Sequence, residues 1–351
     1  MTSAAIPLLK STLVFIAALL LAGCLQQETL TTVPDAENIL FTAEGDLIVS
    51  GGRNIYQITE YTDALGKTGY RRRAIYDDQC MFAGIVQQGE WVITVCQEYV
   101  LQWSGFFLKL VRDNHLLAAN VHQHPLTFQR LDKGLRNDPV DALALPNGMA
   151  VTPDGHLLLA DGNFFAKSGV ARIRMDYSSD LPRVTGFDRD WIGSAFGLSS
   201  ANGVRVQGQE VFISDGNKVR RLTFDQAGNL PLELTDSSGG VISNRATDNV
   251  IYQGGIIIDD IMPICGGVAV TQFVSGQLVY VNRQGQEYAT QLLSLESPSS
   301  LAIGQPPLFS GSDLIVTEKG ILYDHISTVG NKLTRVPMGL DLTAPDVCAL
   351  Y

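Results

Sequence analysis

Residues 145–163 read Leu-Pro-Asn-Gly-Met-Ala-Val-Thr-Pro-Asp-Gly-His-Leu-Leu-Leu-Ala-Asp-Gly-Asn, two short apolar strands joined by a Pro-Asp-Gly turn. A related phrase follows 55 residues later, counted from Gly148 to Gly203, and runs from Ser200 to Asn217. Recurrence of this kind indicates a solenoid or a propeller built from one supersecondary unit. Four weaker copies of the phrase contain the segments Glu37–Phe41, Ala83–Val86, Gly266–Val270 and Ser299–Ile303.

The six copies share one internal pattern. Each contains short strands of aliphatic and β-branched residues separated by Gly, Asp, Asn and Pro turns, and segments with helical periodicity are sparse. A unit of this kind cannot bury its own faces, so six units pack side by side and close into a ring. The sequence predicts an all-β fold over residues 36–351: a six-bladed β-propeller with four-stranded blades around a central channel.

Residues 1–23 have the features of a secretory signal peptide. They contain Lys10, then an apolar run from Leu13 to Leu21, and they end in the small residues Ala22 and Gly23. We therefore expect this segment to be removed from the mature chain.

The segment Leu21-Ala-Gly-Cys24 resembles the bacterial lipoprotein signal, in which the cysteine is acylated and becomes the mature N-terminus. Acyl chains on Cys24 would anchor the chain to a membrane without a transmembrane helix, since stable anchoring takes about two lipid signals. The same resemblance implies that Leu25, in place of an acidic residue, directs the chain to the outer membrane, facing the periplasm. Residues 24–35, polar and rich in threonine, are expected to form a tether. An ordinary cleaved signal followed by a chance cysteine is the alternative.

The chain of 351 residues is acidic, with 25 Lys and Arg against 36 Asp and Glu and a formal charge of −11. Removal of residues 1–23, which contain one lysine and no acid, changes that charge from −11 to −12. Such a surface repels phosphate backbones. The one basic run, Arg71–Arg73, reads as a solvated strand end. Nucleic acid is therefore excluded as an expected partner.

Four cysteines lie in the predicted propeller, and four cysteines allow three connectivities. Cys80 and Cys96 lie symmetrically about Gln88, in a segment that reads as strand, turn and strand. Opposed residues of an antiparallel pair have Cα atoms about 4.5 to 5.5 Å apart, within the range that a disulfide accepts. The pattern predicts a disulfide between Cys80 and Cys96, with two buried free thiols as the alternative. Elimination leaves Cys265 and Cys348 as the second pair.

The form Pro-Asn-Gly-apolar-Ala-Val-x-Pro-Asp-Gly, followed by a strand that ends in Ala-Asp, resembles the regucalcin and gluconolactonase family. Residues 36–40 and 135–163 are also similar to paraoxonases, and residues 200–206 are similar to strictosidine synthases. All of these are six-bladed propellers, and the similarity covers nearly the whole chain after the signal at low density. The resemblance implies a calcium ion in the central channel, which is structural and, in the hydrolases, acts catalytically on lactones or esters.

The inner strands of a propeller line its channel, so equivalent residues at their starts form one ring around the axis. This ring is expected at Glu37, Ala83, Asn147, Asn202, Gly266 and Ser299. Glu37, Asn147 and Asn202 offer the carboxylate and amide oxygens that Ca²⁺ prefers. The resemblance implies that these three residues bind calcium. The alternative for the two Asn-Gly pairs is a hairpin turn.

The fifth ring position departs from the resemblance. The family has an aspartate there, which binds calcium and in several members is the proposed base or nucleophile, whereas this chain has Gly266. Asp259 and Asp260 lie just upstream and could reach into the channel, where either is the candidate catalytic residue. Solvated loop acids are the alternative.

Two functional hypotheses follow. The first is a calcium-dependent hydrolase of lactones or esters, in which the ion polarises the carbonyl and Asp259 or Asp260 activates water. The second is a non-catalytic propeller that binds a small molecule or a protein partner, its active site decayed at Gly266. The hydrolase is favoured because three ligand positions are retained. Histidine catalysis is not expected, because Ala83 stands where paraoxonases use a histidine.

Overall fold

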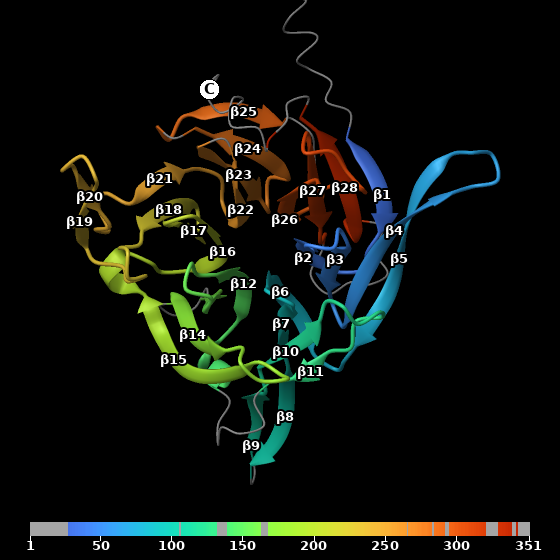
Figure 1. The fold of residues 1–351 in the computed structure, drawn as a ribbon, viewed down its shortest axis with the longest axis horizontal. Helices are drawn as coiled ribbons and strands as arrows, with labels where there is room; N and C mark the ends of the chain where they lie inside the picture. The colour runs from blue at the N-terminus through green and yellow to red at the C-terminus, as the bar shows by residue number, and fades with distance from the viewer. Residues whose placement is uncertain are drawn as a thin grey trace, which may run out of the picture.

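The computed structural model describes residues 27–104, 107–131, 139–162, 168–264, 266–282, 284–291, 295–320, 329–338 and 342. Within these residues, six four-stranded antiparallel sheets surround one axis, each with its innermost strand next to that axis (Figure 1). The predicted all-β, six-bladed propeller is therefore confirmed.

Each blade is numbered by the order in which its innermost strand occurs in the chain. The first three blades contain, from the axis outward, β2 (Ala36–Phe41), β3 (Leu47–Gly51), β4 (Asn54–Thr62) and β5 (Thr68–Asp77); β6 (Met81–Gln88), β7 (Trp91–Gln97), β10 (His115–Asn120) and β11 (Gln129–Arg130); and β12 (Pro146–Val151), β13 (Leu157–Asp161), β14 (Val170–Asp176) and β15 (Arg183–Ile192). The last three contain β16 (Ala201–Gln207), β17 (Glu210–Asp215), β18 (Lys218–Thr223) and β21 (Val250–Gln253); β22 (Ile258–Ile264), β23 (Gly267–Gln272), β24 (Gln277–Val281) and β25 (Glu287–Gln291); and β26 (Pro298–Ile303), β27 (Asp313–Glu318), β28 (Lys332–Pro337) and β1 (Glu28–Thr32).

The ring is closed by strands from both ends of the chain. β1 is the outermost strand of the sixth blade and pairs antiparallel with β28. Arg335 of β28 also forms an ion pair with Glu28 of β1 at 2.5 Å. Residues 28–32 therefore belong to the propeller, and the expected tether over residues 24–35 is wrong for this part. Its threonine-rich composition is that of an edge strand with one face in water.

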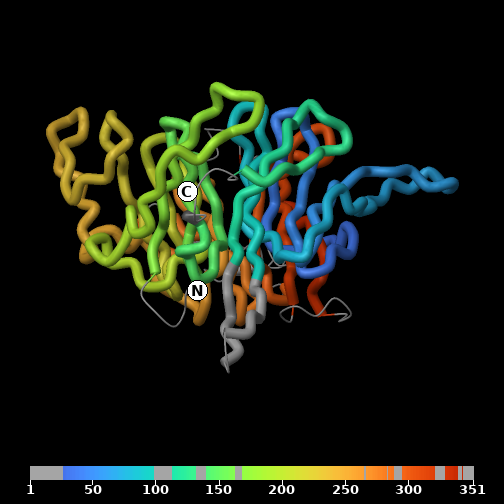
Figure 2. The backbone as a smooth tube through the Cα atoms, turned by 90° about the horizontal axis from the view of Figure 1, so that it is seen from below, coloured from blue at the N-terminus to red at the C-terminus, as the bar shows by residue number. Residues whose placement is uncertain are grey.

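Smaller elements extend from this body. In the described part of the chain, the hairpin of β8 (Tyr99–Ser104) and β9 (Phe107–Arg112) lies between β7 and β10 in sequence, and that of β19 (Glu233–Thr235) and β20 (Val241–Ser243) lies between β18 and β21. The long strands β4 and β5 continue past their sheet as a hairpin that projects from the body (Figure 2). Short 3-10 helices, Pro139–Ala142 and Ser194–Phe196, precede the third and fourth blades.

The core lies between neighbouring blades. Strand β13 shows the principle, because all of its residues are buried and successive side chains point to opposite faces. Leu157 and Leu159 pack in the cluster that contains Ile93 of the second blade. Leu158 packs in the cluster that contains Val204 of the fourth blade. Because each blade of the ring packs between two neighbours, its middle strands need apolar side chains on both faces.

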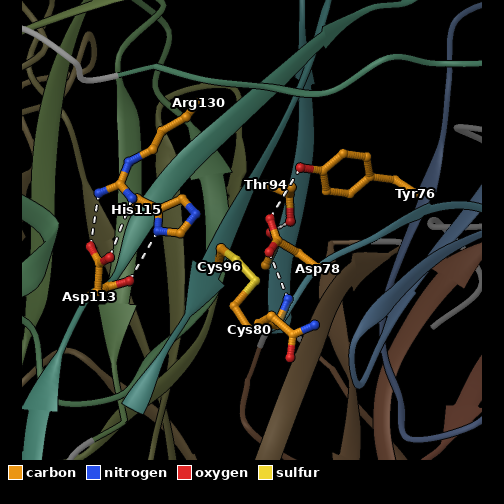
Figure 3. Close-up of a disulfide and its surroundings, with 10 residues drawn as sticks. Tyr76, Asp78, Cys80, Thr94, Cys96, Asp113, His115 and Arg130 are labelled. Atoms are coloured by element: carbon orange, nitrogen blue, oxygen red, sulfur yellow. Dashed lines mark hydrogen bonds and ion pairs between the residues drawn. A yellow bond between two sulfur atoms is a disulfide. The ribbon is translucent and has the colours of Figure 1, made fainter. Parts of the chain in front are cut away.

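The predicted disulfide between Cys80 and Cys96 is present, with the two Cα atoms 5.5 Å apart (Figure 3). It ties the segment that enters β6 to the second strand of the same blade. The predicted register is wrong, because Cys96 pairs with Phe82 of β6 and with His115 of β10. The reason is that the turn follows Gln88 instead of centring on it, and that a bulge between Phe82 and Ile85 adds one residue to β6.

Loss of this disulfide is expected to lower the free energy of unfolding by about 3 kcal/mol, since it closes a loop with a sequence separation of 16. The variant Cys80→Ala/Cys96→Ala, compared with the parent by urea unfolding, measures the effect. An unchanged unfolding midpoint with an unchanged slope would show that the bond adds no stability.

Several sequence predictions concern residues outside the described part of the chain. Cys24, Cys265 and Cys348 lie there, so the acylation, the outer-membrane location and the second disulfide stay predictions. In the part that is described, no helix is long and apolar enough to cross a membrane.

Candidate functional site

Six equivalent β-bulges set the geometry of the central channel. In every blade the pairing of the innermost strand with the second strand begins with one or two residue pairs, is interrupted by a bulge, and then continues in regular register. A bulge leaves a residue out of the ladder and redirects its side chain. The first residue of each bulge is, in blade order, Glu37, Ala83, Asn147, Asn202, Asp259 and Ser299.

The ring therefore contains Asp259 where the sequence predicted Gly266. The inner strand of the fifth blade is β22, which begins at Ile258, whereas Gly267 begins the second strand, β23. The segment Gly-Gly-Val-Ala-Val imitates the repeated phrase, and this displaced the expected alignment by one strand. The predicted loss of the fifth-blade carboxylate is wrong.

The Asn-Gly pairs reflect the close approach of neighbouring blades at the axis. A Cβ atom at Gly148 would lie 2.6 Å from the carbonyl oxygen of Asn202, and one at Gly203 would lie 2.9 Å from that of Asp259. Both distances are shorter than real Cβ contacts allow. Asn147 and Asn202 lie inside β12 and β16, so the hairpin-turn alternative is wrong.

Buried hydroxyl groups fix the backbone of two ring residues. Ser214 of β17 accepts a hydrogen bond from the N–H of Gly203 at 2.6 Å and donates one to the carbonyl of Asp259 at 2.8 Å. Thr317 of β27 donates to the carbonyl of Glu37 at 3.0 Å. Each hydroxyl thus links its own blade to the next one, and both side chains are fully buried.

The acids that end the repeated phrase hold the loops that enter the ring. Asp161 accepts hydrogen bonds from the N–H groups of residues 144 and 145 at 3.0 and 2.8 Å. Asp215 accepts equivalent bonds from residues 199 and 200 at 2.8 and 2.7 Å. Because these loops lead directly into β12 and β16, the two carboxylates position the ring asparagines.

A cavity of about 180 Å³ lies at the ring. Five of the six first bulge residues line it, and four of these five carry side-chain oxygens: Glu37, Asn147, Asn202 and Asp259. The three residues predicted as metal ligands are thus brought together, and a fourth oxygen donor joins them. Apolar side chains line other parts of the cavity, among them Met81, Phe82, Leu145, Ile257 and Phe273.

Three polar residues that line the cavity were not predicted from the sequence: Asp35, Gln97 and Lys319. Lys319 follows β27, and its ammonium group donates a hydrogen bond to the carboxylate of Glu37. Gln97 ends β7, and its side-chain amide donates to the carbonyl of Pro146. Gln97 and Lys319 lie at the ends of second strands and Asp35 precedes β2, whereas the predicted ring residues come from the starts of inner strands.

Burial dominates the electrostatics of Asp259. The residue is 8% exposed, and desolvation raises the pKa of its carboxyl group well above the ordinary value. The negative charge of Glu37 raises this pKa further, whereas the positive charge of Lys319 and a hydrogen bond from the Asn202 amide oppose the rise. A raised pKa makes the Asp259 carboxylate a stronger base than an exposed one, which is the direction that general-base catalysis favours.

Asp260 has a different environment. Its carboxylate forms an ion pair with Arg205 and accepts a hydrogen bond from the hydroxyl of Ser300 at 2.6 Å. Burial raises the pKa of Asp260, and the Arg205 guanidinium opposes that rise. Asp260 is not among the residues that line the cavity. The geometry therefore favours Asp259 over Asp260 as a candidate base.

The donor set of the cavity fits a hard divalent cation. The ring supplies two carboxylates and two amides to one space, which Asp35 and Gln97 also line, and Ca²⁺ binds oxygens of both kinds. In the described residues, the buried side-chain carbonyl oxygens of Asn202 and Gln97 have no hydrogen-bond partner. Because an unpaired buried oxygen is unfavourable, both are suited to a ligand. Of the lining residues that the structure describes, Lys319 is the one that does not fit a cation site, since it brings a positive charge to the same carboxylates.

A second group of side chains with metal-ligand atoms includes the disulfide and two residues beside it. Ligand atoms of Asp78, Cys80, Cys96 and His115 lie within 4.8 Å of one another (Figure 3). Both sulfurs are joined in the disulfide and are not thiolate ligands. The His115 ring also makes a hydrogen bond with the carbonyl of Asp113 at 3.0 Å. Calcium prefers oxygen ligands, so the ring at the axis is the better calcium site.

Comparison with known proteins identifies the fold. No protein-family profile and no curated protein matches the sequence. The structure is similar to that of the calcium-binding protein regucalcin from Agrobacterium tumefaciens, with a TM-score of 0.54 and 14% identity over 89% of this chain and 93% of that chain. A luciferin-regenerating enzyme also gives a TM-score of 0.54, with 13% identity over 89% and 95% of the two chains. The predicted resemblance to regucalcin-like propellers is confirmed at the level of the fold.

Proposed function

We propose that the chain is a metal-dependent hydrolase that acts on small lactones or esters in the central cavity. The observation that carries this proposal is the place of Asp259 in the ring, because it completes two carboxylates and two amides around one cavity. Glu37, Asn147, Asn202 and Asp259 would hold the ion, and calcium is proposed because its ligands in proteins are oxygens of these kinds.

The roles of the side chains follow from their chemistry. A bound divalent cation supplies Lewis-acid polarisation of the scissile carbonyl. Asp259 is the proposed base, since its carboxylate lines the cavity beside the proposed ion, where it can take a proton from the attacking water. The side-chain amide of Asn202 donates a hydrogen bond to the Asp259 carboxylate and orients it. Phe82 and Phe273 give the cavity apolar walls that exclude bulk water from the reacting groups.

A second candidate function is favoured by Lys319. Its ammonium group balances the carboxylate of Glu37 from within the protein. A ring in which Glu37 is already paired needs no metal ion for that charge, which suits a propeller that binds a small molecule without catalysis. The two functions differ in whether a divalent cation binds at the ring and whether turnover depends on it.

For the hydrolase we expect turnover of at least one member of a panel of lactones and aryl esters by the purified full-length chain. Turnover should disappear with a chelator and return with added Ca²⁺. An ion that binds only the folded state also adds stability, about 2.7 kcal/mol at 100 times its Kd. The melting temperature should therefore rise between chelator and millimolar Ca²⁺.

The two measurements separate the candidates. Binding of a panel compound without turnover under any metal condition would favour the non-catalytic propeller. A melting temperature that does not respond to Ca²⁺, together with no turnover, would contradict the metal-dependent hydrolase.

A further inference from the structure

Lys319 brings a positive charge into the ring of oxygen donors. Its side chain is 12% exposed, lines the central cavity and forms an ion pair with Glu37. The same charge acts on the buried carboxyl group of Asp259. Among the described residues that line the cavity, Lys319 is the one cationic side chain.

The fold places Lys319 at a position that turns toward the axis in several blades. It follows Glu318, which forms the pair with Pro298 just before the sixth bulge, and its own N–H bonds to the carbonyl of Ser297 at 3.1 Å. Three of the equivalent residues also line the cavity. The equivalents in the first five blades are Gly52, Gln97, Gly162, Gly216 and Phe273.

The carboxylates of the ring need a counter-charge. Glu37 and Asp259 are 4% and 8% exposed, and buried charges of one sign are unfavourable unless a cation pairs with them or a proton neutralises them. The Lys319 ammonium supplies one positive charge, and a bound Ca²⁺ would supply two to the same carboxylates. Two cations that use the Glu37 carboxylate repel each other at contact distance. Each cation therefore opposes binding of the other at the ring.

We propose that Lys319 is a built-in competitor for the central cation site, whose ammonium group occupies the ring in the metal-free protein and leaves it when a divalent cation binds. The inference rests on the proposed function in one respect, namely that the ring binds a divalent cation. Lysine suits the exchange because its stem is flexible and its ammonium group is strongly hydrated once it reaches water. The wild-type chain then folds without metal and binds Ca²⁺ weakly.

The variant Lys319→Met removes the charge and keeps a side chain of similar length. Isothermal titration calorimetry with CaCl₂ on the full-length chain should show Ca²⁺ affinity about tenfold or more above that of the wild type, because the balance of charge at the ligands sets the affinity of such sites. Lys332→Met is the matched control. Lys332 belongs to the same blade and pairs with Glu296 at 3.0 Å, but does not line the cavity. Its variant should bind Ca²⁺ as the wild type does.

A second measurement uses the wild-type chain and does not depend on the folding of a variant. Acetylation of lysine amines with an N-hydroxysuccinimide ester, followed by peptide mass spectrometry, reports the exposure of each ammonium group. Labelling of Lys319 should rise several-fold when Ca²⁺ is added, because the displaced amine reaches solvent. Labelling of Lys332 should be the same with and without Ca²⁺.

The outcomes separate the two proposals. If Lys319→Met and the wild type bind Ca²⁺ equally and labelling of Lys319 does not change, the competitor is overturned while the metal centre stands. If neither protein binds Ca²⁺ at millimolar concentration, the metal centre itself is overturned, and the competitor with it. Tighter binding in Lys319→Met together with increased labelling supports both.

Discussion

Replacement of Arg205 by methionine is expected to lower the free energy of unfolding by about 3 to 5 kcal/mol, the range for removal of one partner of a buried ion pair. The Arg205 guanidinium on β16 pairs with Asp260 on β22 and donates to the hydroxyl of Ser300 on β26 at 3.2 Å. One side chain thus joins the inner strands of three blades. Without it, the Asp260 carboxylate, which is 3% exposed, keeps its burial and loses its counter-charge.

The free energies of unfolding of Arg205→Met and of the control Arg221→Met are compared by urea unfolding. Arg221 lies 3.7 Å from Glu210, and both of these side chains are 28% exposed. A pair with this partial exposure to solvent contributes about 1 kcal/mol or less. Similar small losses in the two variants would show that the inner pair contributes no more than a surface pair. A second change, Asp260→Leu in the Arg205→Met background, should recover part of the loss, because apolar replacement of a whole buried pair is often close to neutral.

The fold and most of the ring could be predicted because one phrase in the sequence serves two physical needs. At Asn147-Gly148 and Asn202-Gly203 the asparagine lines the cavity, and the glycine allows the next blade to approach. Neither need can be met by many other residue types, so both copies kept a recognisable form. Glu37 was found in the same way, from its place in the copy at residues 37–41.

The ring residue of the fifth blade could not be predicted in this way, because this blade has no glycine where the next blade approaches. Its bulge holds Asp259-Asp260 in place of Asn-Gly, and the Asp260 side chain turns to Arg205. Because the inner strand β22 contains no glycine, the repeated phrase was aligned with Gly266 and Gly267 instead. Gly267 begins the second strand, β23. Pair geometry in the folded chain was needed to correct the alignment.

Lys319 and β1 were missed because their roles depend on partners far away in sequence. Lys319 meets Glu37 across the closure of the ring, and β1 pairs with β28. One signal for Lys319 was present, since Glu318-Lys319 occupies the place of Asp161-Gly162 in the repeated phrase. A charged residue at a position where three other blades have glycine marks an unusual side chain at the axis. For β1, five residues of mixed polarity carry no comparable signal.

Asp259→Asn is expected to reduce turnover of any substrate found by about 10²- to 10⁴-fold, the usual contribution of a general base. The amide has the shape of the carboxylate but cannot accept the proton of water. Ca²⁺ binding should weaken as well, because the ring loses one of its two carboxylates. Asp225→Asn is the control, since Asp225 lies in an exposed turn, where its carboxylate accepts a hydrogen bond from the N–H of Ala227 at 2.9 Å.

Asp259→Asn, although it should weaken turnover and Ca²⁺ binding, should not destabilise the metal-free protein. Burial raises the pKa of Asp259 in the folded state, so above its ordinary unfolded value the ionised carboxylate opposes folding. A neutral amide removes that opposition. We therefore expect Asp259→Asn to melt at the same or a higher temperature than the wild type in chelator at pH 7, and to gain less from millimolar Ca²⁺. A lower melting temperature in chelator, like that expected for Arg205→Met, would instead show that the Asp259 carboxylate supports the fold and that its place in the ring is structural.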